Sequence, residues 1–168
     1  MKKIGIFYGT NSGKSSAVAE EIEFYLKKEQ VKLYDVKEGV EAVEDYENLI
    51  FVTPTYGVGE LQPDWEARLP KLQNMDFKGK LVALAGLGNQ LAFGESYLGG
   101  LRILYDAVVE GGAAIIGRTS PEGYVYKESF AVKDGLFVGL ALDEDNESVK
   151  TPDRIKHWVS SILPLFRD

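Results

Sequence analysis

Short apolar segments alternate along this chain with longer segments whose apolar residues recur at helical spacing. We expect strands at residues 2–8, 31–36, 48–53, 80–85 and 113–117, and helices at 15–27, 63–72, 97–109 and from 151 onward. Strands that are apolar throughout must be covered on both faces, which predicts an α/β fold with a parallel sheet between helices. Five such strands favour an open, doubly wound sheet over a closed barrel.

The residues at the ends of these segments predict where several of them stop. Pro54 is expected to end the third strand, and Gly86 with Gly88 to end the fourth. Thr151 is expected to be the N-cap of the last helix. The buried face of that helix is expected to comprise Ile155, Trp158, Ile162, Leu165 and Phe166.

One region, residues 120–148, breaks the alternation and is rich in glycine, tyrosine and charged residues. A long loop inside a compact domain is usually an inserted functional or docking element. The chain has 168 residues, enough for one domain with a substantial core, and it contains no internal repeat or linker. We therefore expect residues 1–168 to form a single domain.

The charge and the lack of cysteine restrict the kinds of partner and chemistry. A net charge of −7 disfavours nucleic acid or an anionic membrane and suits a partner with a basic face. Without cysteine there is no disulfide, thiolate nucleophile or cysteine-ligated iron–sulfur cluster. The first apolar run is too short for a signal peptide, and no run approaches the ~20 residues of a membrane span. We expect a cytoplasmic protein.

The turn between the first strand and helix, residues 9–15, has the composition of a phosphate site. It reads Gly-Thr-Asn-Ser-Gly-Lys-Ser, and backbone N–H groups at such a turn converge on an anion at the helix N-terminus. The turn is one residue shorter than a nucleoside-triphosphate P-loop, and no aspartate for Mg²⁺ follows the third strand. The hydroxyls of Thr10, Ser12 and Ser15 instead predict a site for a terminal phosphate monoester. A plain helix cap remains the alternative, and Lys14 could face either the phosphate or solvent.

Two further loops, residues 54–62 and 86–93, each place one aromatic residue among glycines. In a doubly wound sheet these loops lie beside the phosphate turn, because ligands bind outside the carboxyl ends of the strands. Glycine lets backbone approach a flat ligand, and an aromatic ring supplies a stacking surface. Either ring alone could belong to the core. Together, Tyr56 and Phe93 predict a clamp for a planar ring.

These motifs together resemble the long-chain group of the flavodoxin family over essentially the whole chain. The residues that carry the resemblance are 9–15, 54–56, 59–66, 86–90, 120–124 and 137–146. The resemblance implies a five-stranded parallel sheet in the order 2-1-3-4-5, with an insertion that splits the last strand. It also implies a monomer that binds flavin mononucleotide (FMN) non-covalently and has no catalytic residue or metal ligand. The residues expected to bind FMN are Thr10, Asn11, Ser12, Gly13, Lys14, Ser15, Pro54, Thr55, Tyr56, Gly57, Val58, Gly59, Leu87, Gly88, Asn89, Phe93, Ser96, Tyr97 and Leu98.

The resemblance implies a low-potential one-electron carrier rather than an enzyme, with FMN cycling between semiquinone and hydroquinone. Partners of the family include ferredoxin-NADP⁺ reductase, pyruvate oxidoreductases, nitrogenase and photosystem I. Acidic residues near the ring, Glu60, Asp64 and Glu66, should disfavour the anionic hydroquinone. The chain departs from the commonest family pattern at Ser12 and Ser15 (usually Thr), Tyr56 (Trp), Gly57 (Asn), Asn89 (Asp) and Phe93 (Tyr).

The main alternative on the same fold is an FMN-dependent NAD(P)H:quinone reductase. Such an enzyme needs room for a hydride donor over the ring, which two flanking aromatic residues oppose. A receiver domain would need acidic residues after the first strand and an aspartate after the third. The chain has Phe7-Tyr8-Gly9 and Thr53-Pro54-Thr55 there.

Several conspicuous residues are expected to have no role in binding. His157 should lie on the surface of the last helix, and Trp65 and Trp158 should serve packing. The acidic residues lack the spacing of an EF-hand and are expected to form a solvated patch that could orient a basic partner. They are Asp143, Glu144, Asp145 and Glu147.

We predict that Gly57→Thr lowers the amount of semiquinone that accumulates during reduction. In the family, a peptide of the second loop turns its carbonyl toward the flavin N5–H, and the matching peptide here is Gly57–Val58. The turned form favours a positive φ, which glycine adopts without the steric cost of a Cβ. The measurement is the long-wavelength semiquinone absorbance during a dithionite titration. Unchanged accumulation contradicts the prediction.

Overall fold

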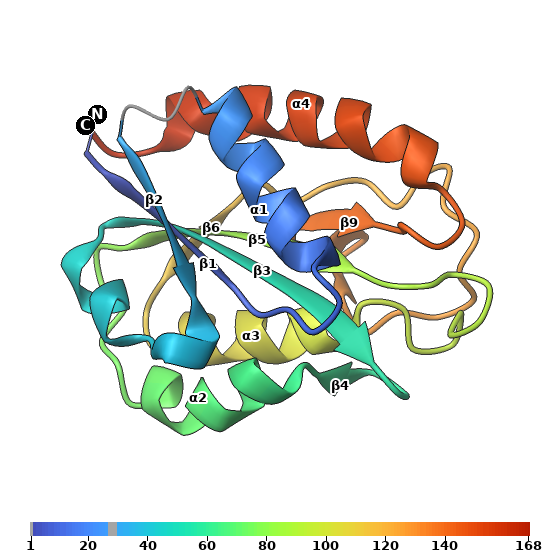
Figure 1. Ribbon diagram of the computed structural model, residues 1–168, viewed down its shortest axis with the longest axis horizontal. Helices are drawn as coiled ribbons and strands as arrows, with labels where there is room; N and C mark the ends of the chain where they lie inside the picture. The colour runs from blue at the N-terminus through green and yellow to red at the C-terminus, as the bar shows by residue number, and fades with distance from the viewer. Residues whose placement is uncertain (1, 27–29) are drawn as a thin grey trace.

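The fold has three layers, with a parallel sheet between two pairs of helices (Figure 1). The computed structural model describes residues 2–26 and 30–168, so the expected end of the first helix at Lys27 lies outside the described residues. The strands are β1 (Ile4–Tyr8), β2 (Val31–Asp35), β3 (Asn48–Tyr56), β4 (Glu60–Leu61), β5 (Leu81–Leu87), β6 (Ala114–Ile116), β7 (Val132–Lys133), β8 (Leu136–Phe137) and β9 (Leu140–Leu142). The helices are α1 (Lys14–Tyr25), α2 (Pro63–Gln73), α3 (Gly99–Glu110) and α4 (Thr151–Ile162).

Successive residues of each central strand enter two separate cores, because side chains of a strand alternate between the faces of the sheet. Ile4 and Ile6 of β1 pack with α1 and α4, whereas Phe7 packs with α2 and α3. The four helices lie on the two faces in the same pairs in Figure 1. This double burial confirms the prediction of a parallel sheet covered on both sides.

The main path of the sheet follows the order β2-β1-β3-β5-β6, which confirms the doubly wound topology. The last strand is split between two segments that both pair with β5. Residues Leu81 to Ala83 pair with β6, and residues Ala85 to Leu87 pair with β9. The insertion therefore lies between Ile116 and Leu140 and carries the β7–β8 hairpin. The expected range of 120–148 began and ended too late, because the chain leaves the sheet after Ile116 and residues 140–142 return to it as β9.

Several element ends differ from the sequence predictions. Strand β3 continues through Pro54 to Tyr56, because Thr55 and Tyr56 pair with β4 and a proline still permits an extended backbone. Strand β5 likewise reaches Leu87, and α3 begins at Gly99 rather than at residue 97.

The two ends of helix α4 also differ from the sequence predictions. Thr151 is the first residue of α4 rather than its N-cap, and its hydroxyl donates to the Glu144 carboxylate. After Ile162 the chain continues in a short 3₁₀ turn, Leu163–Leu165. This turn leaves Leu165 54% exposed, while Phe166 is buried as expected.

The two ends of the described chain are joined at the start of β3 by the buried side chain of Asn48. Asn48 Nδ2 donates to the carbonyl oxygens of Lys2 (3.3 Å) and Arg167 (3.0 Å). Asn48 Oδ1 accepts from the Arg167 N–H at 2.9 Å. One side-chain amide of β3 therefore satisfies backbone groups of two segments that are distant in sequence, at Lys2 and Arg167.

We predict that Asn48→Ala lowers the free energy of unfolding by about 2–3 kcal/mol, because it leaves buried backbone groups without partners. Urea denaturation followed by far-UV circular dichroism measures the change. The matched control is Asn74→Ala at the exposed end of α2, where Nδ2 donates to the Pro70 carbonyl. The control should cost roughly 0.5 kcal/mol or less. Equal losses in the two variants would contradict a special role for Asn48.

Candidate functional site

A cavity opens where the carboxyl ends of β1, β3 and β5 meet, at the edge predicted for a ligand. Sixteen of the residues expected to bind FMN line it: Thr10, Asn11, Ser12, Lys14, Ser15, Pro54, Thr55, Tyr56, Gly57, Leu87, Gly88, Asn89, Phe93, Ser96, Tyr97 and Leu98. Gly13, Val58 and Gly59 belong to the same loops but do not line the cavity, and Val58 is 80% exposed. Glu144 and Asp145 also line it. Sequence reasoning did not place these two there, because only the pairing of β9 with β5 brings them to this edge.

The first loop presents the N-terminus of α1 to the cavity. The Thr10 hydroxyl accepts from the Gly13 N–H at 2.9 Å, and Ser16 Oγ donates to the Gly13 carbonyl at 2.9 Å. Ser15 is buried, yet its Oγ has no hydrogen-bond partner within residues 2–26 and 30–168. A buried hydroxyl without a partner costs about 1–3 kcal/mol. An oxygen-rich ligand at the loop would remove that cost.

Lys14 forms an ion pair that crosses from the first loop to the loop after β9. Its Nζ lies 2.8 Å from Asp145 Oδ1, and both side chains are about half exposed. The hydrogen bond and the charge of Asp145 raise the pKa of Lys14. The structure therefore pairs Lys14 with an acidic neighbour, which is neither the phosphate nor the solvent environment that the sequence left open.

The second loop is the turn between β3 and β4, which holds Tyr56 at the cavity wall. Gly57 has a φ of 51°, a left-handed conformation that a residue with a Cβ adopts only with strain. Burial, followed by the charge of Asp64, raises the pKa of Tyr56. Thr55 Oγ1 is a second buried hydroxyl oxygen with no partner in the described part of the chain.

The third loop runs from the end of β5 to the start of α3. Phe93 lies at its rim and is 47% exposed, while Tyr97 lies deep in the wall and is 1% exposed. The Tyr97 hydroxyl donates to the Leu142 carbonyl at 3.0 Å, and burial raises the pKa of this phenol far above its ordinary value. A Cβ on Gly88 would lie 2.8 Å from the Tyr97 ring, so this position needs glycine.

Comparison with known proteins agrees with this arrangement of three loops. A family model described as flavodoxin matches residues 6–158. A flavodoxin of Nostoc sp. is 44% identical over 166 residues, which cover 98% of each chain. A flavodoxin of Azotobacter vinelandii is 42% identical over 171 residues, covering 99% of this chain and 98% of that one. The chain belongs to the flavodoxin family.

A solved flavodoxin from Fusobacterium nucleatum, bound to flavin mononucleotide, has the same fold with a TM-score of 0.97. It is 51% identical in sequence, and the match covers 99% of this chain and all of the other. The family resemblance read from the loop motifs is therefore confirmed. The relatives include proteins of the same length, in agreement with a long-chain member.

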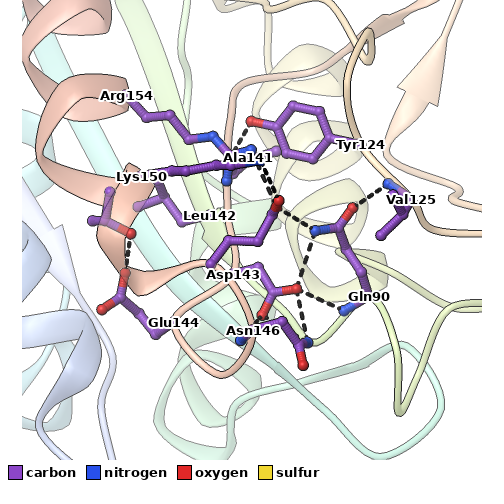
Figure 2. Close-up of polar contacts among 12 residues, drawn as sticks. Gln90, Tyr124, Val125, Ala141, Leu142, Asp143, Glu144, Asn146, Lys150 and Arg154 are labelled. Carbon is purple, nitrogen blue, oxygen red and sulfur yellow. Dashed lines mark hydrogen bonds and ion pairs between the residues drawn. The ribbon is translucent and has the colours of Figure 1, made fainter.

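The acidic segment after β9 is not the solvated patch that the sequence suggested. Asp143 is fully buried, and the side chain of Glu147 is only 13% exposed. Figure 2 shows Asp143 directed at Gln90 and Asn146 rather than at solvent. The expectation was wrong at these two residues because charge alone does not reveal buried N–H donors. Asp145, at 47% side-chain exposure, does reach solvent.

The residues set aside as structural lie where expected. Trp65 is fully buried and its Nε1 donates to the Val52 carbonyl at 3.0 Å, and Trp158 Nε1 donates to the Gly117 carbonyl at 2.8 Å. His157 is exposed on α4. In residues 2–26 and 30–168, no group of acidic and histidine side chains is arranged to hold a metal ion. No helix in those ranges has the length and apolar character to cross a membrane.

We predict that the stabilising effect of Glu147 disappears at low pH. Burial raises the pKa of Glu147, but hydrogen bonds from Lys150, Gln90 and Arg154 outweigh it and leave the pKa below its ordinary value. A carboxylate with a lowered folded-state pKa stabilises the fold above its unfolded pKa of about 4.3, and the effect is lost as the pH falls through the folded value.

The measurement is the difference in unfolding free energy between the wild type and Glu147→Gln, from pH 7 to pH 3. The difference should shrink as the pH falls. Glu122→Gln, at an exposed carboxylate of the insertion, should show a small difference at every pH. A constant, large difference for Glu147→Gln would contradict the prediction.

Proposed function

We propose that residues 1–168 act as one domain that carries single electrons on non-covalently bound FMN. The observation that supports this function is that a phosphate-type loop and two aromatic side chains line one cavity. A buried Ser15 hydroxyl, with no partner among the residues that the structure describes, lies at a helix N-terminus, and Tyr56 and Phe93 line the same cavity. The relatives are flavodoxins, and flavodoxins are electron carriers rather than enzymes.

The residues present fit the chemical parts of FMN. Short neutral donors of the first loop, with the positive end of the α1 dipole, suit a terminal phosphate. Tyr56 and Phe93 supply apolar faces for a planar ring. Thr55 Oγ1, which lacks a partner among the described residues, offers a polar group at the same cavity.

FMN, when bound, supplies the one-electron redox chemistry, and the chain adjusts its energetics. Tyr56 and Phe93 would cover the faces of the ring and shield them from water. Glu60 and Glu144, within a chain of net charge −7, raise the energy of additional negative charge at the site, whereas Asp145 is paired with Lys14. The protein environment therefore favours a low reduction potential for FMN.

Electrons pass between this protein and redox partner proteins. We expect partners of the reductase, pyruvate oxidoreductase, nitrogenase or photosystem I type, a cytoplasmic location and a monomeric state. The acidic surface suits a partner with a basic docking face. An NAD(P)H:quinone reductase on the same fold is not favoured, since the relatives are electron carriers.

The test of the function is the visible spectrum of the purified protein after incubation with FMN. We expect two oxidised-flavin bands that bleach reversibly when dithionite is added and air is readmitted. Addition of NADPH alone should leave the bands unchanged. A colourless protein that takes up no FMN, or steady NADPH oxidation without an added reductase, would overturn the proposal.

We predict that Ser15→Ala weakens FMN binding by roughly ten- to a hundredfold, equivalent to about 1.4–2.8 kcal/mol. The variant removes the buried hydroxyl that would meet the ligand, so the apoprotein should lose no stability. Ser16→Ala is the matched control, because Ser16 Oγ is already bonded to the Gly13 carbonyl. Quenching of FMN fluorescence by apoprotein gives both dissociation constants. Equal dissociation constants for the two variants would show that the Ser15 hydroxyl does not contribute to FMN binding.

A further inference from the structure

The third loop lines the cavity with Asn89 and Phe93 but contains no helix or strand between Leu87 and Gly99. Its first turn is closed by Asn89, whose Oδ1 accepts from the N–H groups of Leu91 (3.2 Å) and Ala92 (2.8 Å). These bonds are local to the turn. They shape it but do not determine where it lies relative to the cavity.

Gln90 connects this turn to two other parts of the chain, the loop after β9 and the insertion. It is 2% exposed, so its polar atoms must find partners inside the protein. Its Nε2 donates to Asp143 Oδ2 (3.1 Å) and to Glu147 Oε1 (2.6 Å), and its Oε1 accepts from the Val125 N–H at 2.6 Å. Figure 2 shows this side chain reaching between the loop after β9 and the insertion.

Asp143 uses both carboxylate oxygens to join the two loops. Its Oδ2 accepts from the backbone N–H of Gln90 at 3.0 Å and from Gln90 Nε2. Its Oδ1 accepts from the backbone N–H of Asn146 at 3.0 Å and from Asn146 Nδ2 at 3.1 Å. Asn146 Nδ2 also donates to Asn89 Oδ1 at 2.8 Å, so the same network reaches a residue that lines the cavity.

The carboxylate charge makes this network strong. Asp143 is fully buried, and a buried carboxylate is tolerated only where hydrogen bonds compensate its charge. Lys150 and Arg154 pair with Glu147. The donors that Asp143 receives are N–H groups of Gln90 and Asn146, and bonds to a charged acceptor are roughly twice as strong as neutral ones.

We propose that Asp143, acting through Gln90, is the positioning residue of the third loop and sets where Asn89 and Phe93 stand against the ligand. The role toward FMN rests on the proposed function, whereas the effect on the loop does not. The insertion also forms hydrogen bonds to the third loop. The Val125 N–H donates to Gln90 Oε1, and the N–H groups of Lys127 and Glu128 both donate to the Gly94 carbonyl at 2.8 Å.

Asp143→Asn is the sharpest variant, because it keeps the shape and removes one acceptor. An asparagine has one oxygen where Asp143 uses two, so either Gln90 or Asn146 must face an NH₂ group. If that variant does not fold, Gln90→Met removes the side-chain amide at similar length and tests the same link.

The first measurement is amide hydrogen exchange in the apoprotein, which needs no ligand. We expect the amides of residues 90–93 to exchange at least roughly tenfold faster in Asp143→Asn, while those of β1, β3 and β5 stay unchanged. The control is Tyr124→Phe, which removes a hydrogen bond between the insertion and Ala141 (2.7 Å) and keeps the ring that contacts Tyr97. It should leave exchange at residues 90–93 unchanged.

The second measurement uses the FMN-loaded protein. Asp143→Asn should weaken FMN binding roughly tenfold and shift both the visible spectrum and the midpoint potential, whereas Tyr124→Phe should move none of them. Uniformly faster exchange across the sheet, or equal effects of the two variants, would overturn the positioning role. Failure of the wild type to bind FMN would instead overturn the proposed function. The exchange data on the apoprotein would still show whether Asp143 positions the third loop.

Discussion

The parallel register of β1, β3 and β5 is the constraint on which the rest of the structure depends. Strand β3 pairs in parallel with β1 on one side and with β5 on the other. The three strands therefore end at the same edge of the sheet. The phosphate loop, the Tyr56 turn and the Phe93 loop follow directly from those three ends. The cavity therefore results from strand pairing, and the helices on the two faces make that pairing stable by burying both sides.

Strand β5 adds a second constraint by accepting two partners along its length. Its first half pairs with β6 and its last residues pair with β9, which leaves the insertion outside the sheet. The same pairing brings the segment after Leu142 beside the third loop. Asp143 is then buried against Gln90, and Asp145 reaches Lys14 of the first loop. An acidic segment distant in sequence thereby becomes part of the site.

The site contains polar groups that the protein leaves unsatisfied and others that it satisfies fully. Ser15 Oγ and Thr55 Oγ1 are buried without a partner in the described chain, which costs stability in the absence of a ligand. Asp143, by contrast, receives donors on both oxygens. The unpaired hydroxyl oxygens and the paired carboxylate therefore have different roles. The unsatisfied oxygens belong to residues that line the cavity, and the satisfied carboxylate connects two loops of its wall.

Local chemistry was sufficient to predict the layers, the order of the elements and most of the cavity lining. Apolar periodicity reports burial directly, and glycine, hydroxyl and aromatic residues at strand ends report the kind of ligand. Local chemistry could not predict that β3 continues past Pro54, that Thr151 begins α4 instead of capping it, or that Asp143 is buried. Each depends on a contact outside its own segment: pairing with β4 for the end of β3, Glu144 for Thr151, and Gln90 for Asp143. Such contacts between separate segments form only in the folded chain and decide the environment of a residue, whereas the sequence shows only its type.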